Sequence, residues 1–318
     1  MRTLITLALA ATAIAALGAT AAAAKPPGTN GKIVTNSDNR VTGAEEIYTV
    51  NPDGTGRHLL GFGETGKWSP DGTNIALGLD CCGAGVLNFD TGVFTALHLD
   101  TLYPNLFLGC GTWSPDGARL ACEGGFIDPT LQGVFTVRSS DGGGLQQITS
   151  DPFGDDCPSD YSPSGKRLVV TVGPPDGPPA LFVVNLQGAG RQQITPAGME
   201  FNFCNGSWSP QGNEILFSAH VPDGSYHSSI WVVHTDGSGL RQIPVPGCGG
   251  PNADPTTIGC FTPTWSPDGK KIVFARRRGN EQSDLYTVNA DGSGLFQVTN
   301  TPDIDEFGGD WGTHPVTQ

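Results

Sequence analysis

Basic residues are scarce in this sequence, which has 17 lysines and arginines against 31 aspartates and glutamates, a formal net charge of −14. A chain this acidic repels the phosphates of nucleic acids, so we expect no nucleic-acid partner. The same repulsion argues against docking to an anionic lipid surface. The acidic balance is instead typical of an exported protein that stays in solution.

Short motifs of the common catalytic folds are also absent. The sequence has no Gly-x-Ser-x-Gly, no His-Glu-x-x-His and no phosphate-binding Gly-Lys-Ser/Thr loop. It has no Cys-x-x-Cys either, so it gives little support for a zinc ribbon or a thioredoxin-like site. No short motif therefore predicts an enzyme, and the function has to be sought in how the chain is arranged.

Only one segment is apolar enough to cross a membrane, and it lies at the beginning of the chain. Arg2 precedes a stretch over 4–24 that is rich in Ala and Leu and ends in three alanines, a small-residue cleavage pattern. This layout predicts a secretory signal peptide over residues 1–24, and the alternative is an uncleaved anchor. We expect residues 25–318 to form a single secreted domain, extracellular or periplasmic, with no membrane insertion after cleavage.

An aromatic residue followed by Ser-Pro recurs through the rest of the chain. The intact or nearly intact copies begin at Trp68, Trp113, Tyr161, Trp208 and Trp265, and a worn sixth copy surrounds Trp311. The intervals between these aromatic residues are 45, 48, 47, 57 and 46 residues. A period of this length is typical of one four-stranded blade of a β-propeller.

Each copy contains a turn and then two apolar runs. In Ser-Pro-Asp-Gly, Pro presets φ at the second turn position and Gly supplies the positive φ that a tight hairpin needs. The runs are rich in Val, Ile and Phe, as strands require. They cover 74–77, 119–122, 167–170, 214–217 and 271–274, and then 86–89, 134–137, 181–184, 230–233 and 285–288. A Gly-rich turn and a short final strand complete each predicted blade.

The first blade lacks a strand that the end of the chain can supply. Segments around Lys32-Ile33-Val34, 47–50 and 57–60 resemble second, third and fourth strands, but no Ser-Pro-Asp-Gly precedes them. The tail around Trp311 provides the missing innermost strand. The sequence therefore predicts an all-β, six-bladed β-propeller of four-stranded antiparallel blades, closed by the C-terminal strand joining the first blade.

These repeats resemble the PD40 or TolB-like propeller repeat, a WD40-like repeat without the Gly-His and Trp-Asp dipeptides. The resemblance covers essentially the whole chain after residue 24 and implies a periplasmic or extracellular propeller that binds a protein or a small ligand. TolB-like translocation proteins carry an additional α/β domain before the propeller. Here the first expected strand begins at Lys32, soon after the predicted cleavage point, so we expect no such domain.

The chain has eight cysteines, all after residue 24, and an even count behind a signal peptide predicts disulfides. Cys110 and Cys122 would face each other across a hairpin centred on Asp116. The other expected pairs join equivalent positions of adjacent blades or close one loop: Cys157 with Cys204, and Cys248 with Cys260. Cys81 and Cys82 could bond to each other, or one of them could bond to Cys110 or Cys122.

The loops at the rim opposite the Ser-Pro-Asp-Gly turns carry the candidate binding residues. Five acids occupy comparable places shortly before a blade aromatic: Asp155, Asp156, Glu200, Asp305 and Glu306. If radial symmetry brings them to the channel mouth, a ring of carboxylates could bind Ca²⁺ or a cationic peptide. The alternative is that they are solvated loop acids. His220 and His227 lie in one loop and could hold a transition metal, although their spacing is also that of ordinary surface residues.

Two functions follow from these patterns. The first is a non-catalytic binding or scaffold module, a monomer that takes a protein, peptide or glycan at the channel-mouth loops. The second is a metal-assisted lyase or hydrolase acting on a saccharide or lactone in the propeller funnel. The second function requires three or more of the candidate side chains to converge within metal-ligand distance. No cofactor is required by the sequence, and Ca²⁺ is the ion that the predicted acids suggest.

Overall fold

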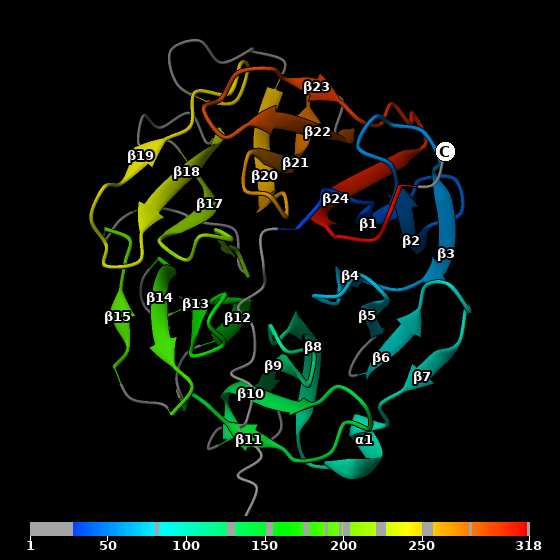
Figure 1. Ribbon diagram of the computed structural model, residues 1–318, viewed down its shortest axis with the longest axis vertical. Coiled ribbons are helices and arrows are strands. Elements are labelled where there is room, and N and C mark those ends of the chain that lie inside the picture. The colour runs from blue at the N-terminus through cyan, green and yellow to red at the C-terminus, as the bar shows by residue number, and fades with distance from the viewer. Residues whose placement is uncertain are drawn as a thin grey trace, which may run out of the picture.

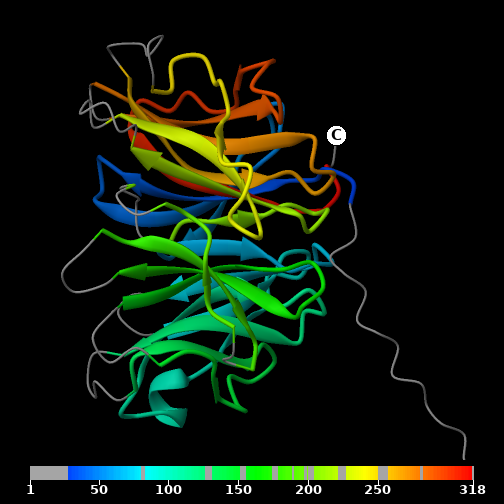
Figure 2. The same ribbon diagram turned by 90° about the vertical axis from the view of Figure 1, so that its left-hand side faces the viewer.

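The structure, a computed structural model, describes the chain from residue 28 onwards with several gaps. The described residues are 28–79, 83–125, 131–150, 155–173, 178–187, 190–196, 199, 204–220, 227–249, 257–279 and 282–316. The predicted signal peptide lies outside them. Within them, antiparallel sheets are arranged around a common centre, and their strands run between the two faces of the ring (Figures 1 and 2).

Four of the sheets have four strands each, and the strand nearest the centre of the ring is the one that contains or precedes the repeat aromatic. The first comprises β24 (Ile304–Trp311), β1 (Ile33–Asn39), β2 (Ala44–Val50) and β3 (His58–Phe62). The second comprises β4 (Thr65–Trp68), β5 (Asn74–Leu79), β6 (Gly83–Asn88) and β7 (Phe94–Ala96). The third comprises β8 (Phe107–Trp113), β9 (Arg119–Gly125), β10 (Gly133–Arg138) and β11 (Gln146–Gln147). The fourth comprises β12 (Asp155–Tyr161), β13 (Arg167–Gly173), β14 (Ala180–Asn185) and β15 (Gln192–Gln193).

The fifth sheet has eight strands. One half comprises β16 (Ser207–Trp208), β17 (Glu214–His220), β18 (Ser228–His234) and β19 (Arg241–Gln242). The other half comprises β20 (Thr257–Trp265), β21 (Lys271–Arg278), β22 (Ser283–Asn289) and β23 (Phe296–Gln297). A single helix, α1 (Leu99–Leu102), connects β7 to β8 among the described residues.

The strand pairing corrects the expectation of six four-stranded blades. Four sheets are separate, and the last two predicted blades are joined where Ser228 of β18 pairs in parallel with Gly259 of β20. Gly259 permits this contact, because a Cβ at that position would lie 2.9 Å from the Cβ of Ser228. A glycine in the long insertion before the Trp265 repeat thus fuses two neighbouring sheets.

The turn in each repeat is held by its own side chains. Ser114 accepts a hydrogen bond from the Arg119 amide at 2.9 Å and donates one to Asp116 at 2.6 Å. Asp116 also accepts the Ala118 amide, and Gly117 takes the positive φ of 70°. The same serine-to-aspartate bond is present at Ser69 and Ser266. These contacts explain why Ser-Pro-Asp-Gly directs the chain from one strand into the next.

The ring closes as the sequence predicts. All of β1 pairs with β24, from Ile33 opposite Trp311 to Asn39 opposite Ile304. The indole of Trp311 also donates a hydrogen bond to the Gly31 carbonyl at 2.9 Å. Segments from the two ends of the described chain therefore share one sheet, which leaves no unpaired edge at the junction.

The repeat aromatics pack between neighbouring sheets. Trp113 belongs to a buried cluster with Ala76 and Ala84 of the sheet before it and Leu120 of its own sheet. Its indole nitrogen donates to the carbonyl of Lys67 on the adjacent innermost strand at 3.0 Å. The core is thus distributed around the ring in the seams between sheets, which leaves the centre to the innermost strands.

Candidate functional site

A central cavity of about 610 Å³ lies between the innermost strands, and we use the name central cavity for it throughout. Its wall is formed by parts of β4, β8, β12, β20 and β24 together with residues 204–206. A second, much smaller space of about 50 Å³ lies at the end of the ring that carries the Ser-Pro-Asp-Gly turns. Pro70, Pro115, Pro163, Pro210 and Pro267 line that narrow space. The centre is therefore wide at one end and constricted at the other.

Small residues keep the central cavity open. Gly109 and Gly111 of β8 lie on its wall. A Cβ built on Gly109 would meet no atom within 4 Å, and one built on Gly111 would meet only the Thr65 hydroxyl at 3.7 Å. Gly109 is also exposed, and its φ is not in the left-handed region. These two glycines are therefore explained by the space that they leave rather than by backbone conformation.

The charges on the cavity wall are mostly acidic. Glu64, Glu123 and Asp310 face a single basic residue, Lys67, among the described residues that line it. The Lys67 ammonium lies 3.8 Å from the Asp310 carboxylate, which also accepts the Trp68 amide at 2.8 Å. Since the charged residues on the described wall are three acids and one lysine, the cavity favours a ligand with positive or hydrogen-bond-donating groups.

Two of the sequence-predicted acids lie on β24, in the seam beside the β20–β23 half-sheet. Asp305 forms a bidentate ion pair with Arg40 at 2.6 and 2.8 Å and accepts the Ser283 amide at 3.0 Å. Glu306 is fully buried, accepts a hydrogen bond from Thr301 at 3.0 Å, and lies 3.5 Å from Arg57. Burial raises the pKa of Glu306 to about 8, although Arg57 acts in the opposite direction. Neither acid lines the central cavity.

Asp156 occupies an equivalent seam on the other side of the ring. It is 1% exposed, accepts a hydrogen bond from Thr149 of the preceding sheet at 2.7 Å, and lies 3.4 Å from Arg191. Thr149 in turn accepts the Val134 amide at 2.9 Å. Asp155 begins β12, but its side chain lies outside the described part of the chain, as does Glu200. The acids that can be placed tie adjacent sheets together and do not form the expected ring at the channel mouth.

The two candidate histidines flank a segment that is not described. His220 ends β17, where it pairs with Ser228, and His227 immediately precedes β18. Both are partly exposed. Within the described ranges, the one group of three potential ligands that lie within 4.8 Å of one another contains neither histidine and none of the predicted acids. The convergence that the lyase hypothesis requires is therefore not seen among these residues.

The six described cysteines form three disulfides, and these join the pairs put forward from the sequence. Cys110 bonds to Cys122 across the β8–β9 hairpin, where the two residues are in register. Cys157 of β12 bonds to Cys204, which precedes β16, and so connects two adjacent sheets. Cys248 bonds to Cys260. Cys81 and Cys82 lie outside the described residues, so their pairing stays a prediction.

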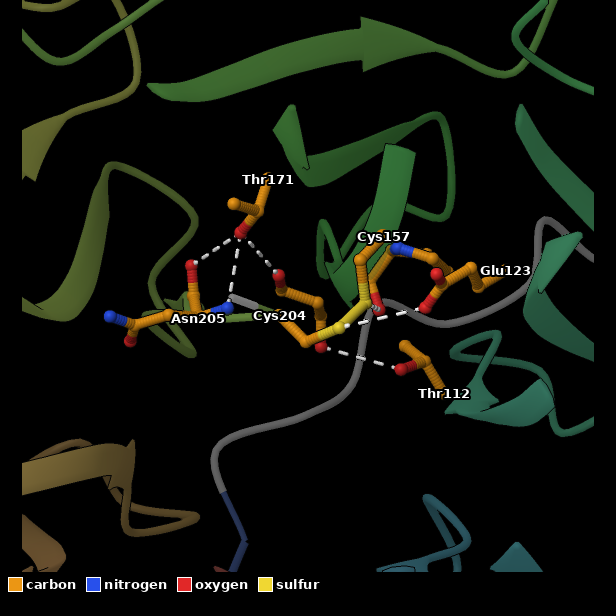
Figure 3. Close-up of a disulfide and its surroundings, with 8 residues drawn as sticks. Thr112, Glu123, Cys157, Thr171, Cys204 and Asn205 are labelled. Atoms are coloured by element: carbon orange, nitrogen blue, oxygen red, sulfur yellow. Dashed lines mark hydrogen bonds between the residues drawn. A yellow bond between two sulfur atoms is a disulfide. The ribbon is translucent and has the colours of Figure 1, made fainter. Parts of the chain in front are cut away.

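Sequence reasoning missed the one carboxylate that stands beside a disulfide in the cavity wall. The Glu123 carboxylate lies 3.8 Å from the sulfur of Cys204 (Figure 3). Glu123 pairs with Gly109 in the β8–β9 ladder, and Cys157, Cys204 and Glu123 all line the central cavity. The sequence contains part of the information that places Glu123. It directly follows Cys122, and because side chains alternate along a strand, Glu123 lies on the opposite face of the sheet from Cys122.

Comparisons with known proteins identify the kind of propeller. No family model matches the chain. The Tol-Pal system protein TolB of Anaeromyxobacter dehalogenans is 29% identical over 99 residues, which are 31% of this chain and 19% of the relative. The crystal structure of TolB from Acinetobacter baumannii superposes with a TM-score of 0.70 at 19% identity, over 88% of this chain and 66% of that one. The chain has a β-propeller fold similar to that of TolB.

Other solved structures show how widely this fold is used. The TolB-like propeller also superposes on a putative TolB from Agrobacterium tumefaciens, with a TM-score of 0.63 at 19% identity, over 89% of this chain and 93% of that one. An oligogalacturonate lyase from Vibrio parahaemolyticus superposes with a TM-score of 0.56 at 14% identity, over 85% and 80% of the two chains. At such identities the likeness concerns the fold alone, so the site has to decide the function.

No helix among the described residues of the TolB-like propeller is both long and apolar enough to span a membrane. The aligned segment of the curated TolB relatives is less than a fifth of their length, so what those whole proteins do is not carried over to this chain.

Proposed function

We propose that this TolB-like propeller is an exported, non-catalytic binding module that takes a segment of a partner protein into the open end of its central cavity. The observation that carries the proposal is the cavity of about 610 Å³, whose wall contains glycines with open space beside them and more acidic than basic side chains. Two aromatic side chains on its wall, Phe107 and the 40% exposed Phe307, offer apolar contacts. A rigid ring with an acidic and partly apolar mouth suits an extended peptide with basic and apolar side chains.

The ring supports this function as a six-bladed propeller. We count the two halves of the eight-stranded sheet as two blades. Each half has its own four antiparallel strands, and among the described residues one pair joins the halves. Two blades that share one parallel contact keep the angular arrangement of separate blades. The three disulfides and the apolar stretch at the beginning of the sequence favour export to an oxidising compartment, where we expect the protein to act as a monomer.

A protein partner is favoured over a saccharide substrate by what lines the cavity. The candidate acids that can be placed, Asp156, Asp305 and Glu306, connect adjacent sheets, and none of them lies on the cavity wall. The curated relatives carry the name Tol-Pal system protein TolB, which names no saccharide. We therefore commit to a peptide segment and treat a glycan as an outcome of the test.

A substitution that fills the cavity tests the proposal. Gly109→Trp places a large side chain where no atom lies within 4 Å, so it should occupy the cavity with little effect on stability. Val93→Trp is the matched control, since Val93 is 61% exposed and does not line the cavity. Peptides are selected from a phage-displayed library on the unmodified protein, and their affinity is measured by titration calorimetry.

The expected result is that selected peptides bind the unmodified protein and Val93→Trp equally and lose at least about 100-fold in affinity for Gly109→Trp, as expected when a binding pocket is filled. Equal binding to Gly109→Trp would place the site elsewhere on the ring and overturn the proposal. Failure to enrich any peptide, together with binding on a glycan array that Gly109→Trp abolishes, would keep the cavity as the site but replace the ligand class.

A further inference from the structure

The disulfide between Cys157 and Cys204 lies in the wall of the central cavity beside a carboxylate. The two sulfur atoms and a carboxylate oxygen of Glu123 all lie within 4.8 Å of one another (Figure 3). Each of the three residues comes from a different part of the ring: β9, β12 and the segment before β16. The three donors therefore meet only because three neighbouring sheets converge on the cavity.

The positions of the three residues do not depend on the sulfur–sulfur bond. Cys157 is held in the β12–β13 ladder opposite Thr171, and Glu123 in the β8–β9 ladder opposite Gly109. The residue after Cys204 is anchored to the same Thr171, whose hydroxyl accepts the Asn205 amide at 3.1 Å and donates to the Asn205 carbonyl at 3.3 Å. These backbone contacts should keep the three side chains together when the disulfide is reduced.

This disulfide differs from the two others in access and in surroundings. Cys204 is exposed and Cys157 is 5% exposed, whereas Cys110, Cys122, Cys248 and Cys260 are all at most 3% exposed. Among the residues that the structure describes, no other cysteine pair forms a group with a third potential metal ligand. A reductant or an ion in the cavity can therefore reach this pair first.

We propose that reduction of Cys157–Cys204 converts this part of the cavity wall into a binding site for a thiophilic divalent cation such as Zn²⁺. The disulfide takes up two electrons and two protons from a reductant and becomes two thiols. A dithiol reductant is oxidised to a disulfide, and a phosphine reacting with water is oxidised to a phosphine oxide. The cation then displaces both thiol protons and binds two thiolate sulfurs and the Glu123 carboxylate. Three negative groups at such short range repel one another, and a divalent cation neutralises most of that charge.

The ligand set fits a borderline-soft cation. Two thiolates and one carboxylate are ligands that Zn²⁺ accepts, and three protein ligands leave a fourth position open to water in the cavity. The Cα atoms of Cys157 and Cys204 are 5.2 Å apart, so only a side-chain rotation is needed to let an ion lie between the sulfurs. The site would be closed in the oxidised protein and open in the reduced one, independently of what the cavity binds as a propeller.

Cobalt is the probe for the test, because Co²⁺ bound by thiolates gives an intense charge-transfer band in the near ultraviolet. The full chain is reduced with a phosphine under anaerobic conditions, the phosphine is removed, and Co²⁺ and then Zn²⁺ are titrated. We expect one thiolate-bound Co²⁺ per reduced chain, its displacement by Zn²⁺, and no band in the oxidised protein. The double variant Cys157→Ser/Cys204→Ser keeps the other six cysteines and should give no band.

Two further variants separate the site from general effects of reduction. Glu123→Gln should weaken Co²⁺ binding by about 100-fold. Removing a residue that only hydrogen-bonds to a metal ligand already lowers metal affinity ~10–100-fold, and Glu123 would be a ligand itself. Cys248→Ser/Cys260→Ser should bind Co²⁺ as the unmodified chain does. The proposal is overturned if reduced wild type gives no band, if Cys157→Ser/Cys204→Ser keeps it, or if Glu123→Gln binds as tightly as wild type.

Discussion

The two ends of the ring are built on opposite principles. At the turn end, the same hydrogen bonds recur from copy to copy, and five prolines close the centre to a space of about 50 Å³. At the other end, the innermost strands differ from one another, and the cavity between them holds about 610 Å³. Glycines, a disulfide and three acidic side chains replace the repeated turn there. The repeated residues make the scaffold, and the residues that depart from the repeat make the site.

The largest effect that we predict breaks the repeated part. Trp208 is 4% exposed and packs with Val169 of the sheet before it and Phe217 of its own sheet. Trp208→Ala should lower the free energy of unfolding by about 3–5 kcal/mol, because the lost area leaves a void between two sheets. Phe62→Ala is the control, since Phe62 is 71% exposed and its loss should cost less than about 0.5 kcal/mol. Urea denaturation measures both, and similar losses would show that the seams do not carry the core.

The second effect concerns a seam acid at the cavity end. Glu306 has a folded pKa of about 8 and an ordinary value of 4.5, so the folded state holds its proton over a range in which the unfolded chain has lost it. The contribution of the neutral Glu306 side chain to the free energy of unfolding is fully present below pH 4.5, and it is lost as the pH rises to about 8. The expected slope is at most about 1.4 kcal/mol per pH unit. Glu306→Gln stays neutral, so its stability should exceed that of wild type increasingly between pH 5 and pH 8.

Urea denaturation across this pH range gives the comparison. Parallel curves for Glu306→Gln and wild type would mean that Arg57, 3.5 Å away, already keeps the carboxyl ionised in the folded state. Thr301→Val is a useful companion variant, because it removes the hydrogen bond to Glu306 without changing its charge. It should lower stability by about 1 kcal/mol at low pH and by more above pH 8, because the hydrogen bond from Thr301 lowers the pKa of Glu306 and so favours the ionised carboxyl.

The contrast between the two ends also explains which features of the structure can be predicted from the sequence. Turn residues and the spacing of aromatics identify the strands and the ring closure between β1 and β24. The three disulfides also follow from the sequence, because their cysteines are close in one segment or occupy equivalent positions of adjacent blades. The fusion of two sheets at Ser228 and Gly259 depends on one close approach in a long insertion, which no period reveals.

The direction in which side chains point on the innermost strands is even harder to predict from the sequence. Register shifts interrupt these strands between Cys110 and Thr112 of β8, and between Pro158 and Asp160 of β12. A third shift lies opposite Asn36 and Ser37, where β24 holds Gly308 and Glu306. Because one extra residue exchanges the two faces of a strand, acids expected at the channel point into seams. The presence of carboxylates before Tyr161, Trp208 and Trp311 was therefore predictable from the sequence, but the face of the strand that they occupy was not.

The smallest predicted effect concerns a copy of the repeated turn that lacks its aspartate. In the Tyr161 copy, Ser164 replaces the aspartate of the turn, and Ser162 has only the Ser164 hydroxyl at 3.2 Å in its place. Ser164→Asp should add the carboxylate bonds that Asp116 makes and raise the free energy of unfolding by about 0.5–1.5 kcal/mol at pH 7. The reverse change, Asp116→Ser, should remove a similar amount.

The pH dependence distinguishes this gain from a packing effect. Hydrogen bonds from Ser114 and Ala118 lower the pKa of Asp116, so the stability that they contribute is present above the ordinary pKa of 3.8 and is lost as the pH falls through the lower folded value. The advantage of Ser164→Asp should therefore be constant from pH 5 to pH 7 and decline in acid below pH 4. If instead it persists unchanged at pH 2, the aspartate acts through turn conformation alone, and the hydrogen bonds of the repeated turn contribute little to the ring.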